Sequence, residues 1–159
     1  MIALQDNSPA VVSPGIYPML YAFFDDRGVL RQDPFRRQVD AALGTQAAGV
    51  AILGLGTEVS KLTFDERIEV LEVVAKRIDG RKPLLATVYG DTITEQIEFS
   101  KRAIQSNASA LMLQPPSQKM DDAKLAGFFS EIISAVDCPV GIQNAPEFLG
   151  FGLSNQSLI

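Results

Sequence analysis

Residues 49–80 read GVAILGLGTEVSKLTFDERIEVLEVVAKRIDG, and they contain one complete unit of a recurring pattern. The stretch opens on a short apolar run, Gly49–Gly54, which is typical of a strand buried on both faces. After a glycine-containing loop, Thr63 and Glu66 have the spacing of a capping box that starts a helix. Apolar residues then recur at helical spacing until Gly80 ends the helix. The stretch therefore predicts a strand, a loop and a helix in succession.

Similar units lie on both sides of this stretch, and together they predict five strands separated by four helices. The predicted strands are Ile16–Phe24, Gly49–Gly54, Pro83–Tyr89, Ala108–Gln114 and Pro139–Gln143. The predicted helices begin at the N-cap Asp33 before Pro34, at Thr63, at Thr92 with Glu95 as a second capping box, and at Asp121 or Asp122. Residues 144–152 are predicted to be a loop, and Ser154 is predicted to cap a further helix. Regular alternation of strands and helices indicates parallel βαβ units.

Two architectures are compatible with this alternation. A doubly wound sheet of five strands would be complete at about 150 residues, whereas a (β/α)8 barrel needs about 250. We predict the α/β class, of the (β/α)8 TIM-barrel type, with about the first five strands and four helices present. Residues 1–14 are predicted to be a flexible arm, and residues 15–159 to be the N-terminal part of one barrel domain that ends before strand six. Strand order separates the alternatives, because it is 1-2-3-4-5 in part of a barrel and 2-1-3-4-5 in the doubly wound sheet.

Composition excludes several classes of protein. The 159 residues are 47% hydrophobic and carry a net charge of −5, which argues against disorder. The sequence pI of about 4.7 and the scattered basic residues argue against a nucleic-acid partner. No apolar stretch approaches the length of a membrane span, and no secretory signal is visible, so we expect a cytoplasmic protein without a membrane partner. The chain has no histidine and one cysteine, so we expect no disulfide, no histidine base and no metal site.

Three loops that follow predicted strands carry a resemblance to a known family. They are Gly54–Arg67, which contains Gly-x-x-x-Glu and then Leu-Thr-x-x-Glu-Arg, Leu113–Ser117, and Gln143–Gly150, which contains Asn-x-Pro. From about Gly15 to its last residue, the chain resembles the dihydrodipicolinate synthase and N-acetylneuraminate lyase family. The resemblance implies a (β/α)8 barrel, usually tetrameric, in which a lysine forms a Schiff base with pyruvate or another 2-oxo acid. It also implies a small 2-oxo acid as partner, a homo-oligomer, and no cofactor.

The family's functional positions are carried over one at a time. Gln143 occupies the position of the proton-shuttle tyrosine, and an amide cannot act as a general acid or base near pH 7. Leu55 and Gly56 occupy the positions of the two threonines that hold the substrate carboxylate, and Thr57 follows one step later. The resemblance thus predicts substrate-binding roles for Gly56, Thr57, Gln143 and Asn144, with no catalytic residue in the chain. We expect Gly56, Thr57 and Gln143 to surround one pocket.

Other departures from the family bear on the reaction. The Schiff-base lysine position lies beyond the last residue of the chain, and Ser117 stands where the family has a relay tyrosine. Phe148 stands where synthases have an arginine that binds a second carboxylate, so a dicarboxylic substrate has no cation to pair with there. We therefore predict a truncated or divergent member of the Schiff-base lyase and aldolase family that is inactive as this chain alone. The alternative is a non-enzymatic α/β binding or regulatory domain of the receiver or flavodoxin type.

Several polar residues permit both a functional and a structural interpretation. Gly54–Thr57 could bind an anion through backbone N–H groups, or it could be an ordinary turn whose glycines adopt positive φ. Asp25 and Asp26 could hold Mg²⁺, as in a receiver domain, but a solvated turn is the favoured interpretation. Glu58 is interpreted as a structural residue, and Cys138 as a small buried hydrophobe, because no histidine is present to activate its thiol.

Overall fold

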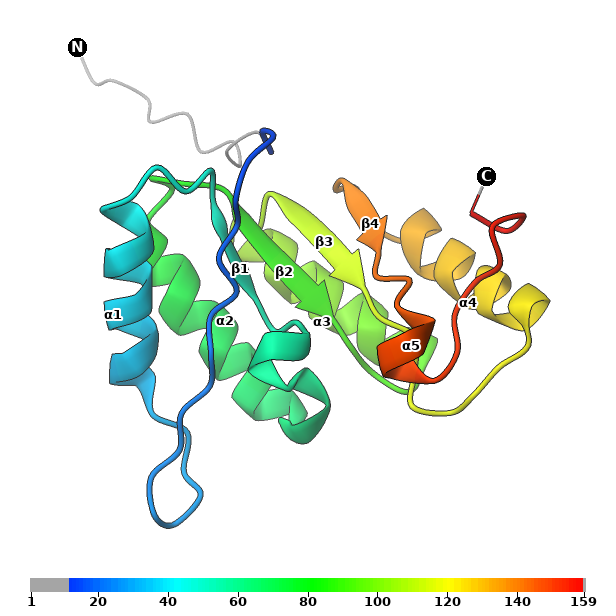
Figure 1. The fold of residues 1–159 in the computed structure, drawn as a ribbon, viewed down its shortest axis with the longest axis horizontal. Helices are drawn as coiled ribbons and strands as arrows, with labels where there is room; N and C mark the ends of the chain where they lie inside the picture. The colour runs from blue at the N-terminus through cyan, green and yellow to red at the C-terminus, as the bar shows by residue number, and fades with distance from the viewer. Residues whose placement is uncertain (1–11, 159) are drawn as a thin grey trace.

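The computed structural model describes residues 12–158, so most of the predicted arm 1–14 lies outside the described residues. Four parallel strands form one sheet in the order β1-β2-β3-β4. The strands are β1 (Val50–Ile52), β2 (Leu84–Val88), β3 (Ala110–Leu113) and β4 (Val140–Ile142). The helices are α1 (Gln32–Leu43), α2 (Phe64–Ile78), α3 (Ile93–Gln105), α4 (Asp122–Ser134) and the short α5 (Pro146–Leu149), as Figure 1 shows. Two 3₁₀ turns, Leu55–Thr57 and Val59–Lys61, join β1 to α2.

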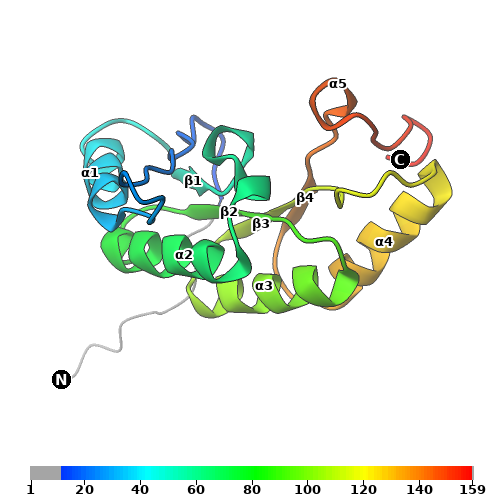
Figure 2. The same ribbon diagram turned by 90° about the horizontal axis from the view of Figure 1, so that it is seen from below.

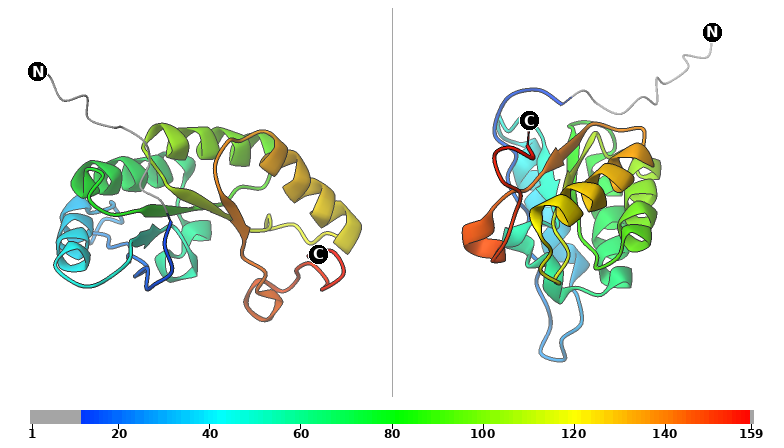
Figure 3. Two further views of the ribbon diagram at one scale, coloured as in Figure 1. Left: turned by 90° about the horizontal axis from the view of Figure 1, so that it is seen from above. Right: turned by 90° about the vertical axis from the view of Figure 1, so that its right-hand side faces the viewer.

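The long helices lie along one side of a curved sheet. Figures 2 and 3 show α2, α3 and α4 following the outer face of the strands, with α1 at the end of the row beside β1. The 3₁₀ turns and α5 lie on the other side. A doubly wound sheet carries helices on both faces, whereas a barrel carries them only on the outside. The arrangement is therefore that of part of a (β/α)8 barrel, which confirms the predicted fold class.

The core lies between this sheet and its row of helices. In the parallel register Ile52 pairs with Ala86 and Ala86 with Leu111, and all three are fully buried. From the helices, Val70, Val74, Phe99 and Ile132 complete the same apolar cluster. Val70 and Val74 are four residues apart on α2, which is the spacing of one face of a helix.

The segment Ile16–Phe24 differs from its prediction as a strand buried on both faces. It forms a single parallel bridge, between Met19 and Ala51, and Ile16 is 76% exposed. The Leu20 N–H donates to the Ala51 carbonyl (2.9 Å), but Pro18 has no N–H to donate. Among the described residues the segment pairs across the sheet with β1 alone, so it is an open edge. An apolar strand is buried on both faces only where other strands or helices pack against it, and here one side of the segment has no neighbouring strand among the described residues.

This segment nevertheless decides the strand order. It lies beside β1, on the side away from β2, so the order along the sheet follows the order along the chain. That order is the one expected of part of a barrel, and it contradicts the receiver or flavodoxin alternative, whose second strand would lie outside the first. Within residues 12–158, no helix is both long enough and apolar enough to cross a membrane.

Helix boundaries depart from prediction in three places. Helix α1 begins at Gln32, so Asp33 lies in its first turn and does not cap it. The predicted loop 144–152 contains α5, which has Pro146 at its start and Gly150 in the left-handed conformation at its end (φ 81°). Ser154 does not cap a helix, because its N–H and hydroxyl both bond to the Asp122 carboxylate at 2.8 Å. The capping box of Thr63 with Glu66 is present as predicted.

Candidate functional site

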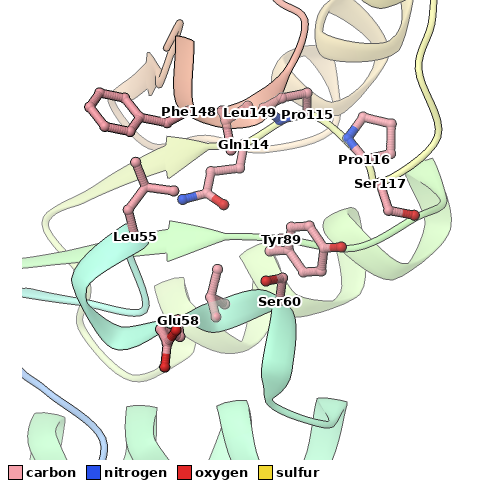
Figure 4. A pocket seen from close by; sticks show the side chains of 11 residues that line it. Leu55, Glu58, Ser60, Tyr89, Gln114, Pro115, Pro116, Ser117, Phe148 and Leu149 are labelled. Carbon is pink, nitrogen blue, oxygen red and sulfur yellow. The ribbon is translucent and has the colours of Figure 1, made fainter. Parts of the chain in front are cut away.

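A cavity of about 320 Å³ lies at the carboxyl edge of the sheet, and Figure 4 shows it from close by. Its walls come from the loop after β1, the end of β2, the loop after β3 and helix α5. The lining residues are Leu55, Glu58, Val59, Ser60, Tyr89, Gln114, Pro115, Pro116, Ser117, Phe148 and Leu149. In (β/α)8 barrels the carboxyl edge is the face that carries ligands. The cavity is therefore the candidate site.

The loop after β1 holds its shape through two residues in the left-handed conformation, Leu53 (φ 62°) and Glu58 (φ 55°). The sequence analysis offered an ordinary turn in which the glycines adopt positive φ, but neither Gly54 nor Gly56 does so. Gly54 lets the Met19 side chain approach the loop closely, because a Cβ there would lie 2.3 Å from the Met19 Cε atom, which would have to shift. Non-glycine residues in this region cost of order 1 kcal/mol or more and are concentrated at functional sites. The backbone conformation places Glu58 and Ser60 at the cavity.

Thr57, which the sequence predicts to bind substrate, is 2% exposed and does not line the cavity. Its hydroxyl donates to the Leu20 carbonyl (2.5 Å) and accepts from the Leu53 N–H (3.1 Å). Its own N–H donates to the Gly54 carbonyl at 3.0 Å. The side chain thus ties the edge segment to the loop after β1. Gly56 does not line the cavity either.

We expect Thr57→Val to lower the free energy of unfolding by about 2 to 4 kcal/mol, because it leaves the Leu53 N–H and the Leu20 carbonyl buried without their partner. Thr57→Ser keeps the hydroxyl and should cost only about 1 kcal/mol, the value of one methyl group. Urea unfolding of both variants measures the difference. If valine and serine were equally tolerated, the hydroxyl would have no structural role.

Gln143, which the resemblance places at the proton-shuttle position, is half-buried and bonded to a cavity residue. Its Oε1 accepts from Gln114 Nε2 at 2.7 Å. Gln114 is 2% exposed, and its carbonyl accepts from the buried side chain of Gln96 at 3.0 Å. The bond to Gln143 holds the Gln114 side chain, and the bond from Gln96 holds its backbone, so that the amide lies near the centre of the cavity in Figure 4. The structure thus brings Gln143 to the site through Gln114.

Asn144 turns away from the cavity and holds the end of the chain. Its Nδ2 donates to the Leu153 carbonyl at 2.9 Å, and its Oδ1 accepts from the Leu153 N–H at 2.8 Å. A Cβ at Gly152 would lie 2.3 Å from that Oδ1, so glycine is needed for the approach. Both polar atoms of the Asn144 side chain are therefore already bonded within the chain.

Tyr89, which the sequence analysis did not single out, directly follows β2 and lines the cavity. Burial raises the pKa of its phenol, and the negative charge of Asp91 raises that pKa further. The Asp91 carboxylate accepts the Ser117 N–H at 2.8 Å, and this bond lowers the pKa of Asp91. Near neutral pH the site therefore holds a protonated phenol beside an ionised carboxylate. The one signal in the sequence was the place of Tyr89 at the carboxyl end of a predicted strand.

Arg67 supports this wall from behind. Its guanidinium donates to the Tyr89 carbonyl and pairs with Glu95 at 2.6 Å, and its side chain is 6% exposed. It also lies 5.7 Å from the centre of the Tyr89 ring. Glu95 accepts the Asp91 N–H rather than that of Thr92, so only half of the second predicted capping box forms. The Glu95 carboxylate thus lies between the Arg67 guanidinium and the Asp91 N–H, behind the wall.

Other predicted candidates lie elsewhere. None of the six lysines lines the cavity or ends a strand, and Lys82, before β2, donates to the carbonyls of Thr45 and Ala47. Asp25 accepts the N–H groups of Arg27 and Val29 at 2.9 Å, which is the turn interpretation of that pair. Within residues 12–158, no three His, Cys, Asp or Glu side chains are grouped closely enough to hold a metal ion.

The parallel βα units follow one another in barrel order, and a cavity lies at their carboxyl edge. These two features place the chain in the class of (β/α)8 proteins. The model of the dihydrodipicolinate synthetase family matches residues 13–158, and the chain belongs to that family. It is 30% identical over 132 residues to a 4-hydroxy-tetrahydrodipicolinate synthase from Pelobacter propionicus, covering 82% of this chain and 46% of that protein. It is 27% identical to the L-2-keto-3-deoxyarabonate dehydratase of Azospirillum brasilense, covering 83% of this chain and 44% of that one.

A solved structure extends the likeness to three dimensions. YagE, a prophage protein of the same family from E. coli K12, was solved in complex with pyruvate. It superimposes on this chain with a TM-score of 0.84 at 28% identity, covering 91% of this chain and 49% of YagE. The chain thus spans about half the length of the relatives that it matches.

Proposed function

We propose that this chain forms the N-terminal part of a lyase-type (β/α)8 barrel and binds a small 2-oxo acid, such as pyruvate, in the cavity at the carboxyl edge. The observation that carries the proposal is the convergence of three βα loops and α5 on one cavity of about 320 Å³. Relatives named for synthase and dehydratase activities, and the pyruvate complex of YagE, support it. The cytoplasmic location predicted from the sequence is part of the same proposal.

The cavity offers neutral donors to a carboxylate. Ser60, Tyr89 and Ser117 carry hydroxyl groups there, and a hydroxyl can donate to a carboxylate oxygen. Gln114 Nε2 and its partner Gln143 supply amide groups beside them. Thr57 and Asn144, predicted with Gly56 to bind substrate, serve this proposal indirectly. Thr57 holds the loop after β1 that contains Gly56, and Asn144 holds the segment that follows α5.

Pyruvate titration of the ¹⁵N-labelled chain tests this proposal. A three-carbon acid held by hydroxyl groups alone should bind weakly, with a Kd on the order of 1 mM. We expect shifts of the amide signals of Ser60, Tyr89 and Gln114, and loss of those shifts in Gln114→Ala. The control is Ile133→Ala, at a 39% exposed residue of α4 that does not line the cavity. Pyruvate that shifts no cavity amide would refute the proposal.

We expect no Schiff-base chemistry from this chain by itself. Imine formation needs a lysine amine at the substrate carbonyl, and none of the six lysines lines the cavity. Borohydride reduction in excess pyruvate, followed by intact-mass measurement, should leave the chain without a stoichiometric adduct. An adduct on one lysine would show that the chain carries its own catalytic amine.

The open edges predict self-association, in line with the expected homo-oligomer. Ile16, Tyr21 and Phe23 are each exposed by nearly half or more, and an apolar hollow of about 510 Å³ lies between their segment and α1. All three residues of β4, at the other edge, are half-buried. We expect sedimentation to show species heavier than the 17.2 kDa monomer. A compact monomer with a cooperative melt would contradict this expectation.

A further inference from the structure

The cavity has a polar end and an apolar end. In Figure 4, Tyr89, Ser60 and Ser117 gather on one side, Leu55 and Phe148 lie on the other, and the Gln114 amide lies between them. The two apolar side chains come from the loop after β1 and from α5, segments that are far apart in the sequence. The apolar end is therefore built by the tertiary structure and is not a local run of hydrophobic residues.

Both side chains at the apolar end are accessible to solvent. Phe148 is 75% exposed and Leu55 is 37% exposed. Exposed apolar groups that line one concave surface mark a place where apolar ligand surface can be buried. The cavity of about 320 Å³ is also larger than a three-carbon acid. One water takes up about 30 Å³ in the liquid, so the six heavy atoms of pyruvate, at about that volume each, would leave part of the cavity empty. Room remains beyond the polar end for a further substituent.

The charge of the cavity acts against a second anionic group. Among its eleven lining residues, Glu58 is the only acidic residue, and no lysine or arginine is among them. Arg67, which supports the wall from behind, is already paired with Glu95. A carboxylate at the apolar end would lose water without gaining a cation, and it would be repelled by Glu58.

We infer that the cavity selects a 2-oxo acid whose remote end is apolar and uncharged, and that Phe148 and Leu55 determine this specificity. The acid group lies at the hydroxyls of Tyr89, Ser60 and Ser117, and the apolar substituent lies between Phe148 and Leu55. This inference rests on the proposed function, and it deepens that function by naming the class of substrate.

The test uses ¹⁵N titration of the full chain to compare two probes that share a 2-oxobutanoate backbone and differ in the group at its end. 2-Oxo-4-phenylbutanoate carries an apolar end, and 2-oxoglutarate carries a second carboxylate. We expect the phenyl compound to bind roughly tenfold or more tightly than 2-oxoglutarate, and to shift the amide signals of Leu55 and Leu149. Equal affinities, or tighter binding of 2-oxoglutarate, would overturn the inference.

Phe148→Arg should reverse the order of the two probes, because it removes the apolar wall and supplies a cation. We expect 2-oxoglutarate to gain roughly tenfold in affinity and the phenyl compound to lose as much. Ile133→Arg is the matched control, since it adds the same charge at an exposed apolar residue of α4 and should leave the ratio unchanged. The high exposure of Phe148 makes the variant compatible with folding, and a dispersed amide spectrum checks this. An unchanged ratio in Phe148→Arg would refute the role of Phe148.

A third probe, 4-phenylbutan-2-one, has the apolar end without the carboxylate and separates the two proposals. If it shifts Leu55 and Leu149 while no 2-oxo acid binds, the apolar subsite stands and the proposed function fails. If pyruvate binds and the phenyl group adds nothing, the proposed function stands and this inference fails. If none of the probes binds, both are overturned.

Discussion

Replacing Arg67 with methionine is expected to lower the free energy of unfolding by about 2 to 4 kcal/mol. The side chain is 6% exposed, pairs with Glu95 at 2.6 Å and donates to the Tyr89 carbonyl. Methionine keeps most of the apolar stem but leaves Glu95 and that carbonyl without their partner. The value lies below that for a fully buried pair because Glu95 is 31% exposed. Urea unfolding at a fixed protein concentration measures the change.

Arg77→Met provides a matched control on the same helix. Like Arg67, Arg77 pairs with a carboxylate, and it makes two bonds of 2.7 Å to Asp40. The Arg77 and Asp40 side chains, however, are 47% and 45% exposed. Solvent screens such a pair, so its loss should cost at most about 1 kcal/mol. Similar losses from Arg67→Met and Arg77→Met would show that burial does not set the value of the Arg67 pair.

The Arg67 variant should also weaken pyruvate binding. Arg67 does not line the cavity, but it bonds to the backbone of Tyr89, which does, so its effect on binding would be through the position of Tyr89. Arg67→Lys keeps the charge but cannot reach both partners with one planar group, so it should restore binding only in part. The amide signal of Tyr89 is the readout. A variant that is destabilised yet binds pyruvate normally would give Arg67 a purely structural role.

Phe99→Ala is expected to cost about 3 to 5 kcal/mol, the range found for a large aromatic side chain removed from a core. Phe99 lies on α3, is fully buried, and packs edge-to-face on Phe64 with ring centres 6.2 Å apart. Its removal leaves a cavity between the helix and the sheet, and it also removes the ring–ring contact. The midpoint of urea unfolding should fall accordingly.

Phe148→Ala is the control for the same chemical change at an exposed position. Because that ring is 75% exposed, its loss should alter the free energy of unfolding by no more than about 0.5 kcal/mol. A large loss of stability from Phe148→Ala would mean that α5 contributes to the core. A small loss from Phe99→Ala would mean that the core repacks around the missing ring.

Much of the fold could be predicted from local patterns. The Thr63–Glu66 capping box and the apolar runs that became β1 to β4 depend on residues close together in the sequence, and they appear where expected. The candidate site was predicted less well. Thr57 and Asn144 were selected by resemblance, yet their polar side-chain atoms bond to backbone groups of the chain itself. Tyr89, which lines the cavity, and Arg67, which supports it, were not selected.

The sequence by itself determined the alternation of strands and helices, and it indicated the family, because periodicity and motif spacing are properties of consecutive residues. Tertiary structure alone decided the rest. Ile16–Phe24 carries the apolar pattern of a buried strand, but burial depends on which neighbours lie beside it, and among the described residues β1 is the only sheet strand that pairs with it. The pairing of Arg67 with Glu95, and the meeting of Phe148 with Leu55 at one cavity, join segments that the sequence keeps far apart. Such contacts form only when the chain folds, because each depends on where the parallel strands place the loops that follow them.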